Sequence, residues 1–202
     1  MNYLAIDTSG KNLTVIIKKD GQIFSYHDAE CGVNHSVALM PKIEELSKKA
    51  NFELSNADFF ACVVGAGSFT GIRIGVATVK AMCFAFNKPC LSITSFDMLA
   101  YNKSGGKILT LIDAKHDGFY ACGYIDGEIS LEPCYIMRDK VLELLNEYKG
   151  VSSTVIKDMK TELVSVETGL INAVNAKQEY ITDDLESLIP LYCRKSQAEE
   201  GR

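Results

Sequence analysis

The sequence lacks an uninterrupted apolar run of the roughly 20 residues that a membrane span needs. Its first segment, MNYLAIDTSG, contains no basic residue, and an aspartate at position 7 interrupts its apolar stretch. We therefore expect neither a signal peptide nor a membrane anchor, and we expect a cytoplasmic location. With 47% hydrophobic and 23% charged residues, the composition is that of a globular protein.

Metal and disulfide motifs are also missing. No CxxC pair occurs among the seven cysteines, and no HxxxH pair occurs among the three histidines. Several cysteines lie inside apolar segments, which is typical of buried free thiols in a reducing compartment. A formal net charge of −5, with the cations scattered in short groups, argues against nucleic-acid binding by this chain alone. We expect no metal and no cofactor in the isolated chain.

What the sequence does contain is a weak internal repeat. Residues 4–23 align without gaps on residues 110–129, with five identical positions. In each copy an apolar segment ends at Ile-Asp, a polar turn follows, and a second segment runs to Asp-Gly, where glycine supplies the positive φ of a tight hairpin. Chance similarity between two hairpins is the alternative. We favour a duplicated module, and hence two lobes, at residues 1–100 and 101–202.

Helical and strand patterns alternate between and after the two copies. Strands that alternate with helices indicate an α/β fold with some parallel strand pairing. A polar tail after about residue 194 is expected to be disordered. The patterns predict helices at 35–50, 71–86, 138–148 and about 169–176, and strands at 57–65, 91–93 and 154–156.

A glycine-rich loop joins the strand at 57–65 to the helix at 71–86. It does not end in the GK[ST] of a Walker A motif, and Thr70 stands where a dinucleotide fingerprint has its third glycine. Close helix packing therefore explains the loop better than a phosphate site does, although both stay open. The loop residues of interest are Gly65, Gly67, Ser68, Thr70 and Gly71.

The helix at 71–86 has small residues four positions apart and is apolar nearly all round. Such a helix presents faces that another backbone can approach closely, and it is not expected to face water. One face must pack on its own sheet, and the other is free to meet a partner. The sequence thus points to a covering element, either within the fold or from another subunit.

Asp7 and Asp113 are equivalent residues at the strand ends of the two copies. Facing each other across a cleft, and together with Ser9, they could form a vestigial Mg-nucleotide site. The alternative is that each aspartate accepts hydrogen bonds from its own turn. The absence of a GG-type loop after residue 150 favours the second interpretation, because nothing there could enclose an adenosine.

Five segments in the same order are similar to the TsaB family, also called YeaZ, over about residues 2–198. They are LAIDTSGKNLTV, HSVALMPKIEEL, GAGSFTGIRIGVATVKAM, DAKHDGFYA and PLYCRKSQA. Two departures stand out. Ala66 replaces the proline that is usual in the glycine loop, which we expect to loosen the turn, and the second lobe is short for the family.

The resemblance implies an actin-like ATPase fold, of the sugar kinase and Hsp70 class, in a chain that is not catalytic by itself. It implies a non-catalytic activating subunit for a catalytic paralogue, TsaD. With a TsaE-like ATPase, that complex attaches a threonylcarbamoyl group to adenosine 37 of tRNAs that read ANN codons. Contact with tRNA is then expected only through the complex, and a nucleotide is conceivable at the joint interface.

The resemblance also places the partner contact on the helices at 35–50 and 71–86. The side chains that we expect to face outward are Met40, Ile43, Glu44, Ser47, Ile72, Val76, Val79, Lys80 and Cys83. A homodimer through the same face is compatible with this hypothesis. The rival hypotheses are an actin-like kinase that uses Asp7, Ser9 and the loop at 65–71, and a glycoprotease-type metallopeptidase, which would need ligands that the sequence lacks.

Overall fold

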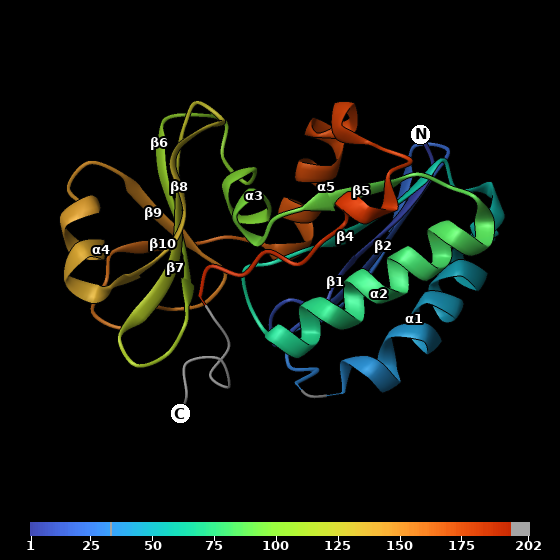
Figure 1. The fold of residues 1–202 in the computed structure, drawn as a ribbon, viewed down its shortest axis with the longest axis horizontal. Helices are drawn as coiled ribbons and strands as arrows, with labels where there is room; N and C mark the ends of the chain where they lie inside the picture. The colour runs from blue at the N-terminus through green and yellow to red at the C-terminus, as the bar shows by residue number, and fades with distance from the viewer. Residues whose placement is uncertain (33, 195–202) are drawn as a thin grey trace.

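The computed structural model of the chain describes residues 1–32 and 34–194, which form two five-stranded sheets (Figure 1). The first sheet has the order β3-β2-β1-β4-β5. The central strand β1 pairs antiparallel with β2 and parallel with β4. The antiparallel hairpins therefore lie on one side of β1, and the strands joined by parallel crossovers lie on the other. Its strands are β1 (Tyr3–Asp7), β2 (Leu13–Lys19), β3 (Gln22–Asp28), β4 (Phe59–Val63) and β5 (Cys90–Ile93).

The second sheet repeats this topology strand for strand. Its order is β10-β9-β6-β7-β8, with β6 antiparallel to β7 and parallel to β9. Strands β1 and β6 both end at the aspartate of the Ile-Asp pair, which confirms the duplicated module. The strands are β6 (Lys107–Asp113), β7 (Gly118–Ile125), β8 (Glu128–Met137), β9 (Lys149–Ser152) and β10 (Thr161–Leu163).

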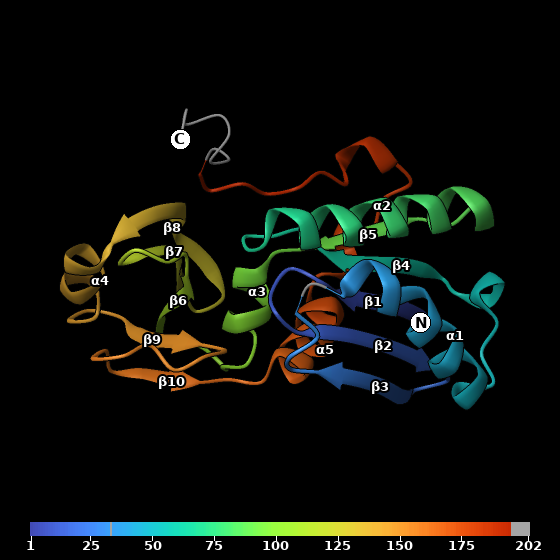
Figure 2. The same cartoon turned by 90° about the horizontal axis from the view of Figure 1, so that it is seen from below.

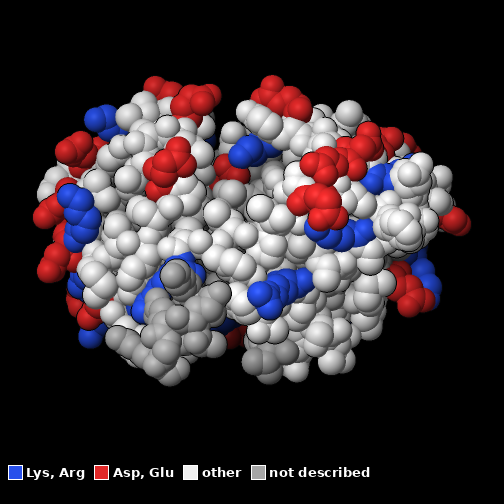
Figure 3. All heavy atoms as spheres, viewed as in Figure 1, with Lys and Arg blue, Asp and Glu red and all other residues white. Residues whose placement is uncertain are grey.

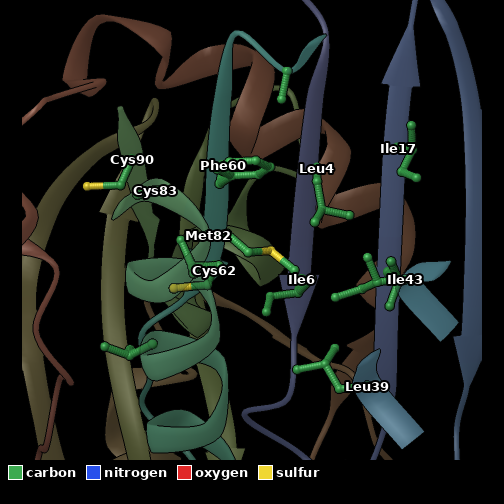
Figure 4. Packing of buried hydrophobic residues seen from close by; sticks show 14 of the residues in the cluster. Leu4, Ile6, Ile17, Leu39, Ile43, Phe60, Cys62, Met82, Cys83 and Cys90 are labelled. Atoms are coloured by element: carbon green, nitrogen blue, oxygen red, sulfur yellow. The ribbon is translucent and has the colours of Figure 1, made fainter. Parts of the chain in front are cut away.

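Two helices cover each face of the first sheet (Figure 2). Helices α1 (His35–Ala50) and α2 (Phe69–Phe86) share one buried cluster with β1, β2 and β4. Helices α3 (Ser95–Ala100) and α5 (Val166–Ala176) share another on the opposite face. Figure 4 shows the first cluster, where Leu39 and Ile43 of α1 point toward Ile6, Leu4 and Ile17 of the sheet.

The second lobe is reduced. Helix α4 (Arg138–Leu144) has 7 residues, against 16 in its counterpart α1. The described residues between β9 and β10 form no helix, whereas α2 with its 18 residues joins β4 and β5. The second lobe is therefore short in its crossover connections, and among the described residues the two long helices, α1 and α2, both pack on the first sheet.

Several predicted elements need correction. The predicted helix at 35–50 coincides with α1, and α2 begins two residues before the predicted position. The strand expected at 154–156 is wrong, because the chain forms β9 earlier and β10 later. The boundary at 100/101 also fails for the last part of the chain: α5 packs on the first sheet, where Leu170 and Val174 are fully buried. The tail after about residue 194 lies outside the described residues.

Helix α2 adds one observation to the expectation that the chain has no membrane anchor. It is the one helix among the described residues that is long and apolar enough to cross a membrane, judged by length and composition alone. Its apolar run is not unbroken, because α2 combines a high mean hydropathy with two cations, Arg73 and Lys80. The core helix of a globular protein passes the same test, and one side of α2 is buried against the sheet.

Tyr3 offers a test of the first core. Its side chain is fully buried against Phe59, and its hydroxyl has no hydrogen-bond partner among the described residues. Burial raises the pKa of Tyr3 to about 12, so the phenol stays neutral. An unpaired buried hydroxyl costs about 1–3 kcal/mol. We therefore expect Tyr3→Phe to raise the free energy of unfolding by about 1 kcal/mol in urea denaturation.

The matched control is Tyr124→Phe. The Tyr124 hydroxyl is also buried but donates to Asp97 Oδ1 at 3.1 Å. Its removal leaves that carboxylate one donor short, so the free energy of unfolding should fall by about 1–3 kcal/mol. Equal losses in both variants would contradict this description of the Tyr3 hydroxyl.

Candidate functional site

The glycine loop packs against the turn that follows β1. A Cβ atom added at Gly67 would collide with the Ser9 carbonyl oxygen, and one at Gly71 would collide with the Thr8 carbonyl oxygen. Ser68 N donates to Ser9 O at 2.7 Å. The glycines therefore serve a close approach of two backbones, and the Ser68 amide, which a phosphate would need, is already used.

The start of α2 is fixed by hydrogen bonds within the chain. Ser68 is the N-cap and its side chain accepts from Gly71 N at 3.2 Å. Thr8 Oγ1 donates to the Gly71 carbonyl at 2.7 Å. The Gly65–Ala66 peptide is cis, and Ala66 is buried. Thr70 is exposed beside this arrangement and has no role in it.

Asp7 has no free carboxylate oxygen. One oxygen accepts from Ser9 N at 2.8 Å and from Ser9 Oγ at 2.6 Å, and the other accepts from Asn12 Nδ2 at 2.8 Å. Both Asp7 and Ser9 are buried. This is the turn-capping arrangement that the sequence offered as the alternative to a nucleotide site.

Asp113 occupies the equivalent position of the second copy but is exposed. It accepts from Lys115 N at 2.8 Å and from Lys115 Nζ at 2.9 Å. Partial burial opposes the charged form, yet these hydrogen bonds lower the pKa of Asp113 below its usual value. Among the described residues no hydrogen bond joins Asp113 to Asp7 or Ser9, so the structure does not link the three side chains into one site.

No other candidate catalytic cluster emerges from the described residues. They contain no group of three or more His, Cys, Asp or Glu side chains that could hold a metal ion. The seven cysteines are free, and burial raises the pKa of Cys83 and of Cys122 to about 12. Thiols of this kind are poor nucleophiles, because the thiolate is the reactive form.

The outward face predicted for the two helices is largely wrong. The side chains of Ile43, Ile72, Val76, Val79 and Cys83 are buried in the core of the chain itself. Ile43 follows the apolar spacing of α1, which should have placed it inside, and Figure 4 shows it pointing at the sheet. In α2 the sequence is apolar on all sides, so spacing could not separate the inner face from the outer one.

The exposed face of the two helices carries other apolar side chains, which the sequence analysis missed. Val37 is 74% exposed, Met40 51% and Phe84 84%. The helical spacing could have identified Val37, because it lies on the side of α1 opposite the buried residues Leu39 and Ile43. We call these three side chains, with the exposed Ala77 and Ala81 of α2, the α1–α2 surface. In Figure 3 a broad white area with few charges lies over these helices.

Four predicted residues do lie at or beside this surface. Met40 and Glu44 are exposed, and Ser47 and Lys80 are half-exposed. Met40, Glu44 and Ser47 line a groove of about 690 Å³ whose far wall includes Phe86 of α2. The Lys80 ammonium lies 4.0 Å from Glu186. Exposed aromatic and aliphatic side chains next to a groove are typical of a protein-binding site rather than a catalytic one.

Comparisons with known proteins point to one family. A family profile described as TsaD, tRNA N6-adenosine threonylcarbamoyltransferase, matches residues 27–173. The tRNA threonylcarbamoyladenosine biosynthesis protein TsaB of Bacillus subtilis is 25% identical, with 98% of this chain and 96% of that protein covered. The protein of the same name in Escherichia coli is 24% identical at the same coverage.

Solved structures show the fold. YeaZ of Pseudomonas aeruginosa matches with a TM-score of 0.77 at 22% identity and covers 95% of this chain and 99% of its own. A second structure, of an uncharacterized protein with similarity to the peptidase YeaZ from Pseudomonas aeruginosa, gives a TM-score of 0.78 at 24% identity and covers 96% of this chain and 99% of its own. With its duplicated sheets, the chain has the two-lobed actin-like fold. It belongs to the TsaD family, within the TsaB (YeaZ) branch.

The packing of the glycine loop can be tested at Gly71. Within a helix, replacing glycine by alanine normally stabilises by about 1 kcal/mol. Here the added methyl group collides with the Thr8 carbonyl, so we expect Gly71→Ala to lower the free energy of unfolding by about 3 kcal/mol. Urea denaturation measures the difference.

Gly21→Ala is the control, because Gly21 has a φ of +83° and nothing within 4 Å of an added Cβ. Its cost should be that of the left-handed conformation alone, about 1 kcal/mol. A Gly71→Ala variant at least as stable as the parent chain would refute the close approach.

Proposed function

We propose that the chain is a non-catalytic subunit that binds and activates a TsaD-like threonylcarbamoyltransferase. The complex of the two proteins would then carry out the threonylcarbamoylation of adenosine 37 in tRNAs that read ANN codons. The α1–α2 surface is the observation that carries the proposal, since Val37, Met40 and Phe84 are exposed in the free chain. The names of the Bacillus and Escherichia relatives support the same pathway.

The lack of free catalytic groups supports a non-catalytic role. In a kinase the first strand-end aspartate must be available to metal-bound phosphates, but Asp7 accepts three hydrogen bonds from its own turn. The carboxylate of Asp113 is held by Lys115. The glycine loop approaches backbone carbonyls, which repel phosphate oxygens. Catalysis would then rest with the partner.

The chemistry of the surface suits a helical partner. Burial of one Val, Met or Phe side chain contributes about 1.5–3 kcal/mol, so three of them supply a binding core. The small side chains of Ala77 and Ala81 let a partner helix come close to α2. We therefore place the TsaD-like protein on this surface, with its own apolar helices against α1 and α2.

The remaining parts of the proposal follow from the resemblance. A TsaE-like ATPase joins through the complex, tRNA is contacted only through the complex, and any nucleotide lies at the joint interface rather than in this chain. The location is the cytoplasm. In the absence of TsaD, the same apolar surface would pair two copies of this chain.

The test uses Phe84→Asp. Light scattering on a sizing column, for the chain mixed with TsaD from the same organism, should show a one-to-one or two-to-two complex. A charge at position 84 should weaken the complex at least 100-fold, because the aspartate would have to be buried unpaired. The variant itself should stay folded, since position 84 is exposed.

Val155→Asp is the matched control. Val155 is 79% exposed and apolar but lies on the second lobe, between β9 and β10. It should bind TsaD like the parent chain. Unchanged binding by Phe84→Asp would refute the assigned surface, and the absence of any complex at tens of micromolar would refute the proposed function.

An actin-like kinase is the alternative that a direct measurement can decide. Calorimetry of the isolated chain with Mg-ATP should give no binding heat at micromolar concentrations, because Asp7 and Asp113 are held by internal hydrogen bonds. Binding that disappears in Asp113→Asn would revive the kinase hypothesis.

A further inference from the structure

Residues 188–194 run from the first lobe to the second across the start of α2 (Figures 1 and 2). We call this segment the strap. Before it, Thr182 forms an antiparallel bridge with Cys90, which closes the free edge of β5. After Leu188 the strap leaves the first lobe, and at Arg194 it reaches Tyr135 of β8. The two sheets are thus joined by a segment that belongs to neither.

The first half of the strap is anchored in the core. Leu188 is buried within the cluster beneath α1 and α2. Leu191 packs against that cluster and also against the one between the lobes. Leu191 N donates to the Val64 carbonyl at 2.7 Å, and a Cβ added at Gly65 would lie 2.5 Å from the Leu191 carbonyl oxygen. The strap therefore lies directly on the glycine loop.

The second half combines one packed side chain with several more exposed contacts, since Cys193 packs against the cluster between the lobes. The Tyr192 ring stacks on Phe69 with centroids 4.8 Å apart, and Arg73 Nε donates to the Tyr192 hydroxyl at 2.9 Å. The Arg73 guanidinium lies 3.9 Å from the Phe69 ring centroid. At the far end the Arg194 guanidinium lies 4.8 Å from the centre of the Tyr135 ring. Phe69 and Arg73 belong to the first two turns of α2.

The contacts of the strap differ in how much buried surface their release exposes. Release of Leu188, Leu191 or Cys193 would expose buried apolar surface and open a cluster. Release of Tyr192 costs only one partly exposed stack and one hydrogen bond, which are worth little each. The Tyr192 ring can thus swing away while its neighbours Leu191 and Cys193 stay packed, and the first turns of α2 would lose their cover.

We infer that the strap is a clasp: it links the two lobes and holds the start of α2 in the form that binds a partner. Its detachment lowers partner affinity although Tyr192 lies at the opposite end of α2 from Phe84. The effect on partner affinity rests on the proposed function. The effect on the first turns of α2 rests on the contacts of Leu191, Tyr192 and Arg73 alone.

Hydrogen exchange of the full-length chain tests the clasp without a partner. In Tyr192→Ala the hydrogen-bonded amides of residues 71–73 and of Leu191 should exchange about two- to tenfold faster than in the parent chain, the range expected for loss of one aromatic stack. Tyr192→Phe keeps the stack and loses only the bond from Arg73, so its increase should be smaller. Tyr180→Ala removes a similarly exposed tyrosine elsewhere and should change none of these amides.

The same three variants are then titrated with TsaD. The variant with the fastest exchange should bind TsaD most weakly. We therefore expect Tyr192→Ala to bind weakest, Tyr192→Phe to be intermediate, and Tyr180→Ala to bind like the parent chain. Unaltered exchange at residues 71–73 in Tyr192→Ala would overturn the clasp. Faster exchange with unaltered affinity would overturn its effect on the partner. If the parent chain binds no TsaD, the proposed function fails, and the exchange data still decide whether the clasp exists.

Discussion

The arrangement of the first lobe depends on one close backbone contact, between the start of α2 and the turn after β1. Gly67 and Gly71 approach the carbonyls of Ser9 and Thr8 so closely that no side chain fits between them. This contact fixes the direction of α2 across the sheet and hence decides which of its apolar sides is buried. It also uses two donors, because the Ser68 amide donates to the Ser9 carbonyl and the Thr8 hydroxyl donates to the Gly71 carbonyl. A loop that looks like a phosphate cradle in the sequence is thus a packing device.

The two duplicated modules differ in their crossover helices and in their strand-end aspartates. Both sheets have the same order and the same pairing directions, but only the first keeps two long crossover helices. In the second copy a seven-residue helix and a loop replace them. The strand-end aspartates diverge as well, since Asp7 is buried in its turn and Asp113 is exposed beside Lys115. A cleft enzyme of this fold would need both lobes to present catalytic groups, whereas a binding subunit needs only the helical face of one.

The elements that the sequence predicts correctly are those whose positions depend on neighbouring residues. The two hairpins are marked by Asp-Gly, and α1 by one apolar stripe, so their positions are correct within a residue or two. Helix α2 was located, but its outer face was not, because a helix that is apolar on all sides has no period to read. The short strands β9 and β10 carry too few residues for a pattern. The packing of α5 on the first sheet, and the course of the strap, depend on contacts between distant parts of the chain, which spacing cannot reveal.

The contacts that the side chains of α2 make with the rest of the chain identify it as a core helix. By length and composition it could cross a membrane, and Phe84 projects from it almost fully exposed. Its two cations are held by other parts of the same chain, however: Arg73 by Tyr192 and Lys80 near Glu186. Its inner side is fixed to the sheet by Ile72 and Val79, which are fully buried. Beside these contacts Ala77, Ala81 and Phe84 stay exposed on the outer side of α2. Together with Met40 and Val37 of α1, they are exposed apolar side chains of the kind that protein-binding surfaces present.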